Sequence, residues 1–251
     1  MTMLEEAATA AYDPRQAGGT AQKRPFVQRL FTRIAPRYDW FNRLASCGLD
    51  QRWRRLVIAR ARLEPGHRVL DLCTGTGDLA ILCARRQAGH GTVVGVDMNR
   101  AMLSHARRKQ QAQRLSIAWL QGDAEALPLA TGSFDRVMIG FSTRNLGDLT
   151  RGLEEMVRVL RPGGRLAILE TGYPSNPVLR AGYQAFLFTV ARLIGWLLTG
   201  ECWPFTYLAR SVRQFLAPAQ LCERLQRVGT QVEYVPLSCG LASLYLATKR
   251  T

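Results

Sequence analysis

The chain has 251 residues, of which 47% are hydrophobic, so it can bury one full core with elaborations or with a cap. Its net charge of +15 favours an acidic partner, either nucleic acid or anionic lipid headgroups, although an Arg-rich proteome would give the same charge without any partner. The six cysteines show no C-x-x-C spacing and no secretory signal is visible, which disfavours a disulfide framework or a metal site and predicts a cytoplasmic protein with reduced thiols.

The N-terminal part of the chain divides into a tail and a helical segment. Residues 1–24 mix Ala, Gly, Thr and charged residues without periodicity, which predicts a disordered tail. Residues 25–65 carry apolar side chains at helical spacing and predict a helical lid that belongs to a single domain, residues 25–251. Within this lid, Tyr38 and Asp39 are expected at the mouth of a ligand cleft, where packing and binding roles are equally compatible with the sequence.

The most informative segment is residues 68–78. A short apolar strand is followed by a turn with Gly75 and Gly77 and then by residues of helical composition. The free N–H groups of such a helix start can hold a carboxylate or a phosphate. Two glycines alone also fit an ordinary turn, but a second strand ends at Asp97, about 20 residues further on, where the carboxylate of dinucleotide-type folds binds a ribose.

The same segment argues against a dinucleotide. It lacks the three-glycine spacing that accommodates a pyrophosphate, and Asp71 and Asp78 would repel one. Carboxylates at both edges of the turn suit a cationic ligand that has an amino-acid end and a ribose. The sequence therefore predicts S-adenosyl-L-methionine as the cofactor.

Strands and helices alternate through the rest of the chain. Residues 116–120, 134–141 and 165–170 predict further strands, and residues 231–235 and 243–248 predict a final antiparallel pair at the sheet edge. This order predicts an α/β fold, a doubly wound Rossmann-like sheet that is mostly parallel. Asp123, in the loop after the third strand, can accept a hydrogen bond from the exocyclic amine of adenine.

An apolar segment, residues 178–203, interrupts this alternation. Its apolar side chains surround the whole helix, but Arg180, Arg192 and Glu201 make it a poor membrane span. It predicts an inserted cap over residues 175–215. Such a cap either only closes the cleft or also lines a channel for an isoprenoid tail and touches the bilayer.

The glycine turn, Asp97, the DAEALP loop at 123–128 and the LRPGG turn at 160–164 together resemble a class I S-adenosylmethionine-dependent methyltransferase. Further segments resemble the ubiquinone and menaquinone biosynthesis C-methyltransferases, including demethylmenaquinone methyltransferase, which methylate a polyprenylated quinol ring. These segments are IAPRYD at 34–39, GLD at 48–50, Arg144-Asn145 and YLA at 207–209. The cofactor-binding residues are then Asp71, Gly75, Thr76, Gly77, Asp97, Met98, Asp123, Ala124 and Gly140.

The resemblance also implies that Asp78, Arg144, Asn145 and Tyr207 border the acceptor. Methylation of a quinol carbon needs a base and a group that stabilises the phenolate. Asp78 or Asp39, directly or through a water, could be the base, while Arg144 and Asn145 could stabilise the oxyanion. For Arg144 the alternative is a structural ion pair at a strand end.

Three functions remain open at this stage. The first is a C-methyltransferase that acts on a demethylmenaquinol or ubiquinol-precursor ring and contacts an anionic membrane peripherally at its inner face. The second is a related methyltransferase for another aromatic or polyketide small molecule, because Ser142-Thr143, Thr171-Gly172 and Arg210 depart from the family pattern toward the acceptor side. The third, a nucleic-acid-binding protein, is disfavoured because the base-flipping motif and an RNA-binding module are not visible. Monomer and homodimer are both compatible with the sequence.

Overall fold

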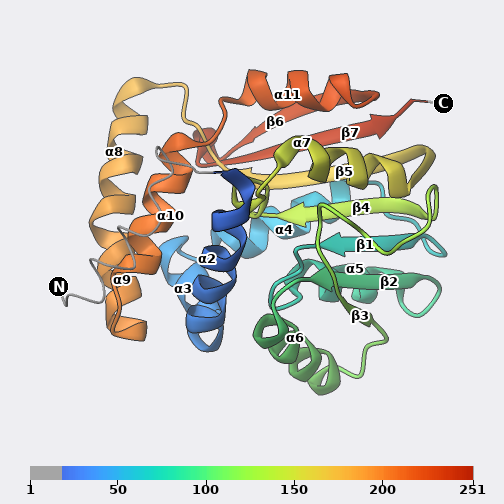
Figure 1. The fold of residues 1–251 in the computed structure, drawn as a ribbon, viewed down its shortest axis with the longest axis horizontal. Coiled ribbons are helices and arrows are strands. Elements are labelled where there is room, and N and C mark those ends of the chain that lie inside the picture. Colours follow the sequence, from blue (N-terminus) through green and yellow to red (C-terminus); the bar gives the residue numbers. More distant parts are fainter. Residues whose placement is uncertain (1–18, 251) are drawn as a thin grey trace.

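The computed structural model describes residues 19–250, and their side chains from residue 23 onward (Figure 1). One seven-stranded sheet runs through the molecule in the order β3-β2-β1-β4-β5-β7-β6. Its first five strands pair in parallel, while β7 is antiparallel to both β5 and β6. The predicted Rossmann-like sheet with an antiparallel C-terminal edge is thus confirmed. The strands are β1 (Arg68–Leu72), β2 (Thr92–Asp97), β3 (Ala118–Gln121), β4 (Phe134–Gly140), β5 (Leu160–Thr171), β6 (Thr230–Leu237) and β7 (Ala242–Lys249).

Helices cover both faces of this sheet because the central strands are apolar on both sides. On one face, α4 (Leu49–Arg60) and α5 (Asp78–Gln87) share a core with β1 and β7. On the other face, α7 (Leu149–Val159) packs against β5, and α11 (Pro218–Arg227) packs against β6 and β7. Helix α6 (Arg100–Ala112) lies along β2 and β3. The carboxyl ends of the parallel strands stay free of these helices, and that edge is where ligands of open α/β sheets bind.

A separate helical layer, which we call the cap layer, covers this edge (Figure 1, left). It joins two segments far apart in the sequence, because the aromatic rings of Phe41 and Phe205 pack with centroids 4.4 Å apart. The predicted lid and the predicted cap segment therefore share one hydrophobic core. The cap layer consists of α2 (Gly19–Ile34), α3 (Tyr38–Ala45), α8 (Pro177–Phe188), α9 (Val190–Thr199) and α10 (Trp203–Gln214).

The N-terminal tail is shorter than predicted. Residues 1–18 lie outside the described part of the chain, but helix α2 already begins at Gly19, so the prediction is wrong for residues 19–24. Lys23 donates to the backbone carbonyls of Arg144 (3.0 Å) and Leu146 (2.6 Å), more than 120 residues away. Local periodicity cannot reveal contacts of this kind.

The apolar segment 178–203 also differs from a single helix. It breaks at Thr189 (φ −115°, ψ −79°) into α8 and α9, and a third helix, α10, folds back against both. By length and composition alone, the stretch Pro177–Thr199 could cross a membrane, with 23 residues and a mean hydropathy of 1.3. Only 17% of its most apolar window is buried in the protein. Of its 23 residues, 11 are exposed, nine are half-buried and three are buried, so one side of the stretch faces outward.

Candidate active site

The glycine turn between β1 and α5 has the backbone that its sequence requires. Gly75 (φ +56°) and Gly77 (φ +84°) are both left-handed. A Cβ atom on Gly77 would lie 2.7 Å from the ring of Trp119, so a larger residue cannot be placed there. The N–H of Gly75 donates to Oδ2 of Asp97 (2.8 Å), and the N–H of Asn99 donates to Oδ1 (2.8 Å). Asp97 thus fixes the turn against the end of β2.

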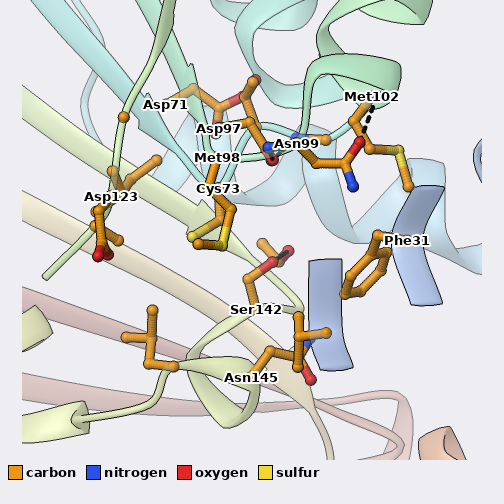
Figure 2. Close-up of a pocket in the computed structure, with 18 of the residues that line it drawn as sticks. Phe31, Asp71, Cys73, Asp97, Met98, Asn99, Met102, Asp123, Ser142 and Asn145 are labelled. Atoms are coloured by element: carbon orange, nitrogen blue, oxygen red, sulfur yellow. Dashed lines mark hydrogen bonds between the residues drawn. The ribbon is translucent and has the colours of Figure 1, made fainter. Parts of the chain in front are cut away.

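A cavity of about 90 Å³, the cofactor cavity, lies at this turn (Figure 2). The ends of β1, β2 and β4 and the loop after β3 form one wall, and Phe31 of α2 lies on the opposite side from Asp123. Arg24 of the same helix pairs with Asp123 (3.1 Å) and closes the rim. Of the predicted cofactor residues, Gly77 shapes the turn and the other eight line this cavity, namely Asp71, Gly75, Thr76, Asp97, Met98, Asp123, Ala124 and Gly140.

Carboxylates outnumber cations around this cavity. Asp71 is buried beside the turn and accepts the N–H of Ala80 (2.9 Å) and the hydroxyl of Thr74, while its Oδ1 has no hydrogen-bond partner among residues 19–250. Burial raises the pKa of Asp71 to about 7, and it also raises the pKa of Asp97. A positively charged ligand would offset the cost of burying these two carboxylates in their charged form.

A second cavity, the acceptor cavity, has a volume of about 370 Å³ and lies inside the cap layer. Its walls are mostly apolar side chains from α2, α3, α4, α8 and α10, with Ala191 from α9. Phe31, Tyr38 and Asn145 line both cavities, so the two spaces adjoin at these residues. The Tyr207 hydroxyl donates to Oδ1 of Asn145 (3.2 Å) and holds this amide toward the junction.

Arg144 lies beside this junction in a buried ion pair. Its Nη1 is 2.6 Å from Oε1 of Glu170, and the hydroxyl of Thr143 donates to Oε2 of the same carboxylate (2.6 Å). The Nε of Arg144 is buried without a hydrogen-bond partner in the described residues. The structural alternative for Arg144 is therefore present, yet one donor remains free on a side chain that lines the acceptor cavity.

Lys109 of α6 connects Asp39 and Asp78, the two carboxylates that the sequence offered as candidate bases. Its ammonium bonds Asp39 (2.9 Å), Thr76 (3.2 Å) and Asp78, and the Thr76 hydroxyl donates to Asp39 (2.5 Å). Burial alone would raise the pKa of Asp78, but the charges of Lys109 and Arg54 outweigh burial, so the pKa is lowered. Asp78 is consequently an ion-paired carboxylate at neutral pH.

Comparison with known proteins places this geometry in a family. Residues 18–249 match the model of the ubiE/COQ5 methyltransferase family. The chain belongs to the ubiE/COQ5 methyltransferase family. It is 41% identical over 233 residues to the demethylmenaquinone methyltransferase of Deinococcus radiodurans, covering 93% of this chain and 96% of that one. It is 40% identical over 228 residues to the 2-phytyl-1,4-naphtoquinone methyltransferase of Thermosynechococcus vestitus, covering 89% and 99%.

The fold agrees with this membership in the ubiE/COQ5 family. The crystal structure of a SAM dependent methyltransferase from Aquifex aeolicus matches with a TM-score of 0.58 at 19% identity, covering 78% of this chain and 88% of that one. Membership in the family makes the protein a methyltransferase and confirms the predicted resemblance.

Within this ubiE/COQ5 protein, the residues predicted to border the acceptor separate into two groups. Arg144, Asn145 and Tyr207 line the acceptor cavity, whereas Asp78 lines the cofactor cavity. Asp39 lines neither cavity and instead joins the lid to the glycine turn through Lys109.

Sequence reasoning missed two residues of this arrangement, Arg24 and Lys109. One signal was available for Lys109. Among the 34 Lys and Arg residues only three are Lys. Each of the three, Lys23, Lys109 and Lys249, donates to at least two polar groups remote in the sequence. In an Arg-rich chain, one of the few Lys residues is a candidate for a site that needs a compact ammonium with three donors.

Proposed function

We propose that this methyltransferase transfers a methyl group from S-adenosyl-L-methionine to a ring carbon of a polyprenylated quinol, such as a demethylmenaquinol or a ubiquinol precursor. The observation that carries the proposal is the junction of two unlike cavities. One is small and rich in carboxylates, the other is larger and apolar, and Tyr38 and Asn145 line both. The names of the relatives, which are methyltransferases of naphthoquinone-type compounds, support this acceptor class.

The residues that line the cofactor cavity suit the proposed cofactor. Asp97 would accept the ribose hydroxyls, and Asp123 with Ala124 would contact the adenine. The free N–H groups of the glycine turn would hold the carboxylate end, and the buried, unpartnered oxygen of Asp71 beside the turn favours a cation in the site. When bound, the cofactor supplies an electrophilic methyl group on a sulfonium centre.

The chain's own residues can prepare a quinol for this attack. The ring carbon becomes nucleophilic when a phenol oxygen loses its proton. Burial raises the pKa of Tyr38, so this phenol stays neutral and can donate to the developing phenolate together with the amide of Asn145 and the free Nε of Arg144. Asp78 is the nearby carboxylate that can accept a proton, directly or through a water.

Residues that depart from the family pattern bear on the alternative acceptor. Thr143 and Thr171 both donate to the carboxylate of Glu170, so they support the buried ion pair with Arg144. Thr171 also lines the acceptor cavity. A different aromatic small molecule is therefore the competing substrate to be tested.

The deciding experiment compares acceptors. We expect the purified protein, given methyl-labelled S-adenosyl-L-methionine, to label reduced naphthoquinols with an isoprenoid chain at a ring carbon, as located by mass spectrometry. Values of kcat/KM should rise with chain length up to the capacity of the acceptor cavity. Labelling of a soluble phenol or polyketide with a higher kcat/KM than any prenylated quinol would overturn the proposed acceptor but not the cofactor.

A further inference from the structure

The exposed apolar side chains of the described residues gather on one part of the molecule. Nine large hydrophobic residues are exposed within the described part of the chain, and all of them belong to α3 or to residues 173–197. A folded domain normally scatters such residues singly, so their concentration on the cap layer marks an interaction surface.

The densest group lies on the two packed helices α3 and α9. Trp40 and Leu44 are one helical turn apart on α3 and are 60% and 50% exposed. Leu193, Trp196 and Leu197 follow at turn spacing on α9 and are 54%, 48% and 68% exposed. These five residues form what we call the docking face.

The opposite sides of the same helices are fixed by the core. Phe41 of α3 and Ala191 of α9 are buried and line the acceptor cavity. Gly195 lets α9 approach Phe205 so closely that an added Cβ would lie 2.1 Å from its ring. Neither helix can therefore rotate to bury its outer side. The docking face and the acceptor cavity are the outer and inner sides of one helix pair.

The charge of the cap layer indicates which kind of partner the docking face binds. Residues 19–45 and 177–214 contain ten Lys or Arg and two acidic residues, Asp39 and Glu201. Asp39 is paired with Lys109 and Glu201 with Arg33, so neither acid is left to balance the other cations of the cap layer. Arg37 and Arg43 are exposed on either side of Trp40. A second copy of this chain would bring two such positive surfaces together, whereas an anionic bilayer is attracted.

We propose that the docking face binds the surface of a bilayer that contains anionic phospholipid. Tryptophan and leucine enter the boundary between headgroups and acyl chains, and the flanking arginines bind lipid phosphates. This inference gives the proposed function a route for its acceptor, because a quinol in that bilayer would lie close to the helices that enclose the acceptor cavity. The docking proposal itself rests on the exposed apolar and basic side chains and does not depend on the proposed acceptor.

The test is co-sedimentation of the full chain with phosphatidylcholine vesicles, with and without phosphatidylglycerol. We expect binding that requires phosphatidylglycerol and decreases as salt rises from about 50 to about 500 mM. L193Q/L197Q should lose at least about tenfold in the vesicle partition coefficient. R37Q/R43Q should lose about fivefold for each arginine. Brominated lipid should quench the tryptophan fluorescence of the wild type, and less so that of W40F/W196F.

A matched control carries the same charge change at the opposite edge of the sheet. Arg85 and Arg86 are exposed at the end of α5, away from the cap layer, so R85Q/R86Q should bind vesicles almost like the wild type. Equal losses in the two arginine pairs, or unchanged binding by L193Q/L197Q, would overturn the docking face. Light scattering that shows a dimer in the wild type and a monomer in L193Q/L197Q would assign the face to a second copy instead.

The two proposals can fail separately. Activity on a water-soluble, chain-less quinol should be unchanged in L193Q/L197Q, because these side chains do not line either cavity. Vesicle binding without quinol methylation would overturn the proposed acceptor and leave the docking face in place. Quinol methylation in detergent without any vesicle binding would overturn the docking face and leave the proposed acceptor in place.

Discussion

The ammonium of Lys109 lies 2.9 Å from the carboxylate of Asp39 and so ties helix α6 of the sheet domain to helix α3 of the cap layer. The same ammonium bonds Thr76 and Asp78 at the glycine turn. One cation therefore links the lid to the loop that would hold the cofactor's amino-acid end. Lid position and cofactor binding should depend on each other through this residue.

The first prediction is that Lys109→Met weakens both the fold and cofactor binding. Asp39 and Asp78 would lose the cation that they share, and their mutual repulsion would favour an open lid. Because the three side chains are partly exposed, we expect a loss of about 1 to 3 kcal/mol in the free energy of unfolding, measured in urea.

The control for this change is Arg107→Gln, which removes one charge from the exposed side of the same helix and should change stability by less than about 0.5 kcal/mol. Titration of both variants with S-adenosyl-L-methionine should show weaker binding only for Lys109→Met. Wild-type affinity in that variant would mean that the lid does not act on the cofactor site.

The second prediction separates the two roles of Arg144. Arg144→Met leaves the Glu170 carboxylate buried without a cation and should cost about 3 to 5 kcal/mol of stability. The double variant R144M/E170Q removes both charges and should recover most of that loss. If the free Nε acts on the developing phenolate, the double variant will bind cofactor normally but turn over at least about tenfold more slowly. Wild-type turnover in the double variant would show that Arg144 is only structural.

The sequence could predict the part of the site that follows from the order of strands and helices along the chain. The strand, the turn and the acid at the end of the next strand are neighbours in a parallel sheet, so the contact between Gly75 and Asp97 follows from the alternation of strands and helices. Asp123 follows from the same rule one strand further on. Each of these residues lies at a strand end whose position depends on topology alone.

The rest depends on how helices are oriented around that sheet. Asp39 and Asp78 were interpreted as candidate bases because carboxylates near a cleft suit proton transfer. Their common partner Lys109 lies 70 residues from Asp39, on a helix whose rotation about its own axis cannot be read from its basic composition. Arg24 likewise pairs with Asp123 across about 100 residues, a contact that the composition and missing periodicity of residues 1–24 do not reveal.

The third prediction concerns Asp97. Asp97→Asn should weaken S-adenosyl-L-methionine binding by about 1 to 3 kcal/mol. The reason is that one of the two carboxylate oxygens that would accept the ribose hydroxyls is replaced by an amide NH₂ group, which can only donate. Calorimetric titration measures the change. Asp123→Asn is the comparison, and we expect a smaller loss because Asp123 is partly exposed and already paired with Arg24. An unchanged dissociation constant in Asp97→Asn would remove the cofactor assignment.

The fourth prediction is a pH dependence that originates at Asp71. Its pKa is raised by burial from 3.8 to about 7, so between these values the native state holds a proton that the unfolded state has lost. The unfolding free energy contributed by this group therefore falls as pH rises through that window, by up to about 1.4 kcal/mol per pH unit, and is constant above it.

Asp71→Asn cannot titrate, so the measurement is the stability difference between wild type and variant at several pH values. We expect the wild type to lose stability relative to Asp71→Asn from about pH 4 to about pH 7, with no further change at higher pH. Other ionisable groups cancel in this difference as long as they are unaffected by the substitution. A difference that does not vary with pH would mean that Asp71 titrates normally.

The last prediction tests whether the acceptor cavity holds the isoprenoid chain. Ala45 lies at the end of α3 and lines the acceptor cavity but not the cofactor cavity, so Ala45→Phe would fill part of the volume of about 370 Å³ without touching the cofactor residues. Each CH₂ group kept out of an apolar site costs about 0.8 kcal/mol, so exclusion of even one isoprene unit should lower kcat/KM for a long-chain quinol by about tenfold or more. A chain-less quinol should be methylated as before. Ala181→Phe, on the exposed side of α8, adds the same ring outside the cavity and should leave both acceptors unaffected. An equal loss on both acceptors would place the quinol ring, and not its chain, beside Ala45.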